Sequence, residues 1–143
     1  MKILLIYIFT SGVIKGSWSE ECLFELKSGT LESQIGVDEY GLSTYQFTLD
    51  RGENVYIYDR YNSSIKKFSK SGKFITELQI PRNFEIWGMI TLSQYLYVVY
   101  KVDKAGKDIY SLRRYSSSLE KEKILSEDTV EIGKCSDLMV YFY

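Results

Sequence analysis

The chain has 143 residues, of which 45% are hydrophobic and 15% aromatic, including 13 tyrosines. That length is enough for a domain with its own core, and the aromatic content favours β-sheet, where large rings pack well on a pleated surface. The formal net charge is −1 with no block of like charge, which argues against a nucleic-acid interface or a polybasic membrane patch. No histidine is present, so the commonest general base, the commonest metal ligand and every histidine-activated nucleophile are excluded for this chain.

Residues 1–19 predict a signal peptide for export. Lys2 supplies a positive start, and residues 3–9 form an apolar run. Residues 17–19, Ser-Trp-Ser, form a small-x-small cleavage site that precedes Glu20. A first β-strand of the fold is the alternative, favoured by the Ile, Tyr and Phe content of the run. The run is too short to span a bilayer as a helix, so no stable membrane span is expected, and export would deliver the chain to the periplasm or the extracellular space.

The chain has two cysteines, Cys22 and Cys135. In an oxidising compartment an even count allows a disulfide between them. Two buried thiols, or partners in further sequence, are the alternatives, and all three stay open at this point.

Apolar runs separated by turn residues fill the next part of the chain. Residues 20–35 form an N-terminal linker with one expected strand at 22–26. The first repeat unit, residues 36–81, holds four expected strands, at 45–49, 55–59, 65–68 and 73–80. Gly52 and Gly72 permit positive φ in two of the turns. The turns leave no room for crossover helices, so the pattern predicts an antiparallel meander.

The same pattern recurs about 41 residues later, in residues 82–130. In this second unit Leu96-Tyr97-Val98-Val99 corresponds to Val55-Tyr56-Ile57-Tyr58, and six extra residues around 104–109 lengthen one loop. A third copy starts within residues 131–143. The second strand of each unit is apolar at consecutive positions, as expected when both faces of a sheet are covered. Four-stranded units with a period near 40 residues are typical of β-propeller blades.

The first unit carries a longer pattern, Asp50-x-x-x-Asn54-Val55-Tyr56-Ile57-x-Asp59-x-x-Asn62-x-x-Ile65-x-x-Phe68-x-x-x-Gly72-x-Phe74. It resembles the NHL-type β-propeller repeat, in which an aspartate and a turn precede a Val/Ile-Tyr-Val-x-Asp strand, followed by an asparagine, an Ile-x-x-Phe strand and a glycine turn. The second unit keeps the apolar frame but has Lys101 or Asp103 in place of Asp59, and lacks the asparagine and the last glycine.

This resemblance implies an all-β fold of four-stranded antiparallel blades, commonly six around a central axis, with binding loops at one end. Six blades at this period need about 250 residues, so the chain corresponds to an N-terminal fragment of about two and a half blades. Missing C-terminal blades, or a homo-oligomer that closes the ring, are therefore expected.

The expected function is that of an exported binding module, without catalysis of its own and without a cofactor or metal. It would contact a protein or a surface polymer through the loop end of its blades, since loops on a rigid scaffold usually carry function. The candidate binding residues lie in or beside the predicted inter-strand loops: Arg60, Tyr61, Trp87, Lys101, Lys104 and Lys107. The turn residues Asp50, Asn54, Asp59 and Asn62 lack the dense acidic pattern of a calcium loop, so their expected role is to hydrogen-bond the turns.

Two alternative functions stay open. One is the N-terminal portion of a propeller enzyme, a lyase or a hydrolase, whose active-site residues lie in further blades. The other is a truncated gene remnant, which would expose apolar sheet faces and open strand edges and would aggregate or dimerise.

Overall fold

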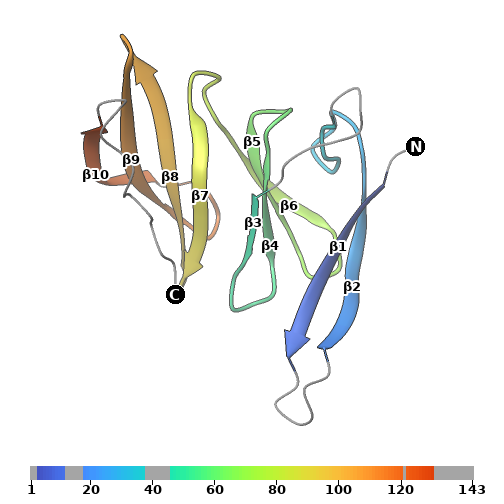
Figure 1. Cartoon of the computed structure of the whole chain (residues 1–143). Coiled ribbons are helices and arrows are strands. Elements are labelled where there is room, and N and C mark those ends of the chain that lie inside the picture. The colour runs from blue at the N-terminus through green and yellow to red at the C-terminus, as the bar shows by residue number, and fades with distance from the viewer. Residues whose placement is uncertain (1–2, 12–17, 38–45, 121, 131–143) are drawn as a thin grey trace. The chain divides into compact units, whose positions relative to one another are not determined.

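The computed structural model describes residues 3–11, 18–37, 46–120 and 122–130. The regular structure in that part of the chain is β-strand, arranged in antiparallel sheets (Figure 1), which confirms the predicted all-β class. The chain divides into two compact units between Ile80 and Pro81. Among the described residues, no helix is long and apolar enough to cross a membrane.

The first unit contains a four-stranded antiparallel meander in the order β3-β4-β5-β6. Its strands are β3 (Gln46–Leu49), β4 (Val55–Asp59), β5 (Ser64–Phe68) and β6 (Phe74–Gln79). Each predicted strand boundary falls within one residue of the observed one. The tight turns that the sequence predicts between these strands therefore set the meander.

Both central strands of this sheet, β4 and β5, are buried at every position. The sequence predicted this for β4 from its consecutive apolar residues. One face of the sheet forms the described core of the unit together with residues that precede it in the chain. The core contains Phe24, Leu26, Ile35, Val55, Ile57 and Phe68, with Leu49 and Phe74 packed against it.

An N-terminal hairpin supplies part of that core. Strand β1 (Ile3–Ser11) pairs antiparallel with β2 (Trp18–Lys27). Residues 3–9 thus form the strand that was the alternative to an export signal, and export itself stays a prediction. Cys22 lies opposite Tyr7 in the hairpin. Cys135 lies outside the described residues, so the three alternatives for the two cysteines stay open.

The second unit contains a four-stranded antiparallel sheet in the order β10-β9-β8-β7. Its strands are β7 (Glu85–Leu92), β8 (Tyr95–Lys104), β9 (Lys107–Ser116) and β10 (Glu122–Val130). Residues 131–143, predicted to begin a third unit, lie outside the described residues.

The six extra residues around 104–109 were predicted to lengthen a loop, and this prediction is wrong. They extend a hairpin instead. Strands β8 and β9 are ten residues each, and their pairing continues up to Lys104 opposite Lys107. Only Ala105 and Gly106 are left to turn the chain, with φ of 55° and 78°. Two central residues with positive φ match the twist of the flanking strands, so the extra sequence forms ladder and not loop.

Burial along β8 also differs from the continuous burial predicted for it. Leu96, Val98, Tyr100 and Val102 are buried, whereas the intervening side chains from Tyr95 to Lys101 are half-buried. One face of the second sheet is therefore covered and the other is partly open to solvent.

Candidate functional site

Arg60 and Tyr61 lie in the turn between β4 and β5, as predicted, and the Tyr61 side chain is 61% exposed. The turn is fixed from inside by Asp59, whose carboxylate accepts hydrogen bonds from the Asn62 backbone amide at 3.1 Å and from Asn62 Nδ2 at 2.7 Å. The backbone amide of Gly36 also donates to Asp59, at 3.0 Å. Tyr61 is thus presented to solvent from a rigid support.

A buried lysine completes this support. Lys66 Nζ lies 3.0 Å from Asp59 Oδ2, and the two side chains are only 1% and 0% exposed. Lys66 also donates to the backbone carbonyls of Leu31 and Gln34. Lys66 therefore connects the segment after β2 to the centre of the sheet through hydrogen bonds and an ion pair.

Asp50 organises the preceding turn in the same manner. Its carboxylate accepts hydrogen bonds from the backbone amides of Gly52 and Asn54, both at 2.9 Å, and from Asn54 Nδ2. Burial raises the pKa of Asp50, but the bonds from Asn54 and the charge of Lys67 outweigh burial and leave the pKa below its usual value. The predicted role of Asp50 and Asp59 in holding turns is confirmed by these bonds.

Trp87 lies on β7, at the bulge between Ile86 and Gly88, and not in a loop. Its side chain is 54% exposed, yet neighbours fix the ring. Tyr110 meets it edge-on with the ring centroids 5.2 Å apart, and Lys101 Nζ lies 5.4 Å from its centroid.

Lys101 is itself held in place by an acid on the neighbouring strand. Its Nζ is 2.8 Å from Asp108 Oδ2, and that hydrogen bond is the main cause of a raised pKa for Lys101. Trp87, Lys101, Tyr110 and Asp108 together form what we call the Trp87 platform.

The remaining candidates, Lys104 and Lys107, are exposed and lie opposite each other beside the β8–β9 turn. Lys101, Lys104 and Lys107 are all strand residues, which corrects their predicted place in a loop, because the hairpin pairs to its tip. The four candidates of the second unit nevertheless gather at one end of its sheet. Arg60 and Tyr61 occupy the corresponding turn, between the second and third strands, of the first sheet.

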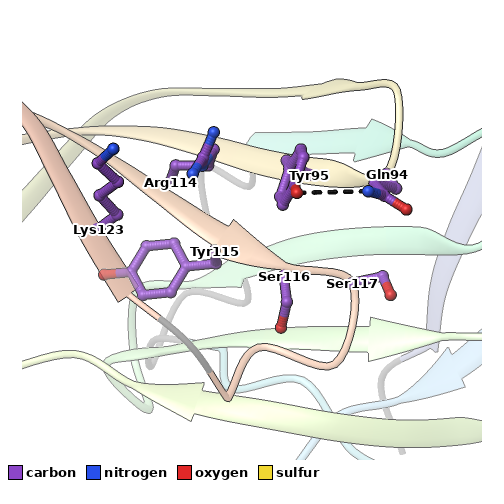
Figure 2. A pocket seen from close by; sticks show the side chains of 7 residues that line it. All are labelled: Gln94, Tyr95, Arg114, Tyr115, Ser116, Ser117 and Lys123. Carbon is purple, nitrogen blue, oxygen red and sulfur yellow. Dashed lines mark hydrogen bonds between the residues drawn. The ribbon is translucent and has the colours of Figure 1, made fainter.

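The opposite end of the second sheet holds a pocket of about 470 Å³, shown in Figure 2. The β7–β8 and β9–β10 turns and the adjoining strands line it with Gln94, Tyr95, Arg114, Tyr115, Ser116, Ser117 and Lys123. The Arg114 guanidinium lies 4.5 Å from the centroid of the Tyr95 ring, and Gln94 Nε2 donates to the Tyr95 hydroxyl at 3.3 Å. Two of the seven lining residues are cationic and none is acidic.

Sequence reasoning did not single out this pocket. The strand register brings Arg114 and Lys123 directly opposite each other, and a register of β9 against β10 is not contained in any local motif.

No protein-family model matches the chain, and no curated protein matches it either. The resemblance to the NHL-type repeat therefore depends on the residues of the first unit alone.

Proposed function

We propose that the chain is a binding module of the NHL-like β-propeller type that contacts a surface polymer or a protein through the ends of its sheets that carry the β4–β5 and β8–β9 turns. The observation that carries this proposal is the Trp87 platform, whose indole ring is 54% exposed and is yet held by contacts with Tyr110 and Lys101.

An exposed ring of this kind favours binding for two reasons. Tryptophan offers a large apolar area together with one hydrogen-bond donor, a combination enriched at interaction surfaces. The contacts with Tyr110 and Lys101 reduce the conformational entropy that the ring would otherwise lose on binding. Within the platform, the Lys101–Asp108 pair supplies a positive and a negative charge beside the indole ring, to which a polymer hydroxyl or a peptide amide can bind.

Binding without catalysis is supported by the chemistry of the chain. The sequence contains no histidine, and the Trp87 platform pairs its only acid with a lysine. Export is supported by the charge and hydropathy pattern of the N-terminus, and the propeller architecture by two four-stranded antiparallel sheets in one chain.

Fluorescence tests the proposal directly because the chain has two tryptophans, Trp18 and Trp87. In the Trp18→Phe variant, Trp87 is the only indole, and we expect its emission to shift to shorter wavelength when an oligosaccharide covers it. Cellohexaose, chitohexaose and polygalacturonate are suitable polymer probes. Binding to a protein ligand is tested with immobilised surface proteins of the source organism.

Calorimetry of the same probes then compares Trp87→Ala with Trp87→Phe. We expect the alanine variant to lose binding and the phenylalanine variant to retain most of it, since the aromatic surface is kept. Equal affinity of Trp87→Ala and the unsubstituted chain would exclude the platform as the binding site.

Sequencing the source DNA past the codon for Tyr143 separates the alternative functions. Further units with acidic or histidine residues near a common axis would favour the enzyme, whereas further units without them would favour the binding module. A stop codon followed by aggregation of the purified chain would favour a gene remnant.

A further inference from the structure

We infer that the pocket lined by Arg114 and Lys123 binds an anionic oxygen group, a carboxylate or a phosphate. This site goes beyond the proposed function, because it lies at the opposite end of the second sheet from the Trp87 platform and shares no residue with it.

The charged residues that line the pocket are both cationic. Arg114 on β9 and Lys123 on β10 are directly opposite each other in the ladder. Like charges at opposed positions of an antiparallel pair destabilise the sheet. Among the residues that the structure describes, neither side chain forms an ion pair. A bound anion would turn this repulsion into two attractive interactions.

The Arg114 guanidinium is held in place by an aromatic neighbour. Arg114 lies over the ring of Tyr95, whose hydroxyl accepts a hydrogen bond from Gln94. This cation–π contact holds the guanidinium beside the ring, 4.5 Å from its centroid, and the fork of N–H donors matches the two oxygens of a carboxylate or phosphate. Arg114 and Lys123 lie on the same side of the sheet in Figure 2.

Hydroxyl groups also line the pocket. Ser116 and Ser117 add hydroxyl groups, which can donate to an anion. Ser116 Oγ is 2.9 Å from Ser118 Oγ, which donates to Glu120 Oε2 at 3.3 Å. The carboxylate of Glu120 is therefore linked to the pocket only through two hydroxyls and does not line it.

The anion can be a free small molecule or a charged group on a polymer, because both present the same oxygens. Thermal unfolding of the full chain distinguishes them when inorganic phosphate, galacturonic acid and polygalacturonate are compared at constant ionic strength. A rise in Tm with phosphate or galacturonic acid indicates a small-anion site, and a rise with polygalacturonate alone indicates a polymer site. Either result supports an anion-binding pocket when Trp87→Ala retains the rise, since the Trp87 platform is then not responsible, whereas no rise with any of the three would overturn it.

The substitution Lys123→Gln gives a signature that a merely structural lysine would not. We expect a higher Tm without anion, because the repulsion with Arg114 is removed. We also expect at least a tenfold loss of anion affinity, since one charge-assisted hydrogen bond contributes about that factor. Lys73→Gln, an exposed lysine of the first unit, is the matched control and should change neither value.

A second variant protects the test against a loss of folding. Arg114→Lys keeps the positive charge but removes the fork, so it should fold and bind the anion more weakly than the unsubstituted chain. If Lys123→Gln and Arg114→Lys both retained full anion affinity, the pocket would not be the site.

Discussion

Asp59 and Lys66 form an ion pair that is almost completely excluded from solvent. Removing two charges from water costs desolvation free energy. The attraction between the two charges offsets that cost only when both partners are also fully hydrogen-bonded. Here Asp59 accepts from Asn62 and Gly36 while Lys66 donates to two backbone carbonyls, so the pair connects three separate segments of the first unit.

The substitution Lys66→Met should therefore destabilise the protein strongly. It leaves the Asp59 carboxylate buried without its cation, which costs about 3–5 kcal/mol for a pair of this kind. Urea denaturation followed by circular dichroism measures the change. Lys70→Met is the control, because Lys70 pairs with Glu53 at an exposed site and its loss should have little effect. A small change for Lys66→Met would show that the pair is dispensable.

Asp50 should make stability depend on acid pH. Its pKa is lower in the folded chain than its ordinary value of 3.8, so the unfolded carboxyl takes up a proton first as the pH falls. The stabilisation is complete above that ordinary value and is lost as the pH falls through the lower native pKa. Melting curves across this range should show a flatter pH dependence for Asp50→Asn than for the unsubstituted chain.

Glu53→Gln is the comparison for Asp50→Asn, because it removes an exposed carboxylate near the same turn. We expect it to keep the steep loss of stability at low pH. Equal slopes for the two variants would show that Asp50 is not the group responsible.

At the scale of single elements, the β8–β9 hairpin depends on an unusual turn residue. Ala105 adopts a φ of 55°, a region that costs a residue with a Cβ about 1 kcal/mol or more and that asparagine and glycine tolerate better. Ala105→Asn should therefore raise the free energy of unfolding by about 1 kcal/mol, since Asn-Gly is the preferred pair for this turn. Ala105→Val should lower it, because a β-branched residue fits positive φ poorly.

The two meanders also show which elements the sequence could predict. In the first meander the strands are four to six residues long and are separated by turns that contain Asp, Asn or Gly, so local turn chemistry located every strand of this sheet. In the second unit Lys104 and Lys107 suggested a polar loop, yet they pair across the hairpin tip. The difference arises because paired backbone can carry charged side chains on its exposed face without losing its hydrogen bonds.

At the scale of the whole molecule, the N-terminal hairpin offers a test of the export prediction. Strand β1 lies inside the predicted signal peptide, residues 1–19, whereas its partner β2 continues to Lys27. The export prediction therefore requires that a chain of residues 20–143 retain a folded first unit without β1. Circular dichroism and thermal melting of this chain, compared with the full chain, measure the effect. Failure to fold would identify β1 as a structural strand and argue against cleavage.

The sequence by itself determined the all-β class, the four-stranded antiparallel meanders and most strand boundaries of the first unit. It could do so because alternating apolar runs and turn residues act within a few positions of one another. Only the tertiary structure placed Trp87 beside Tyr110 and Lys101, and Arg114 opposite Lys123. It also placed the Lys66 ammonium against the backbone carbonyl of Gln34. These contacts depend on strand register and on packing between distant segments, and neither is encoded in a local pattern.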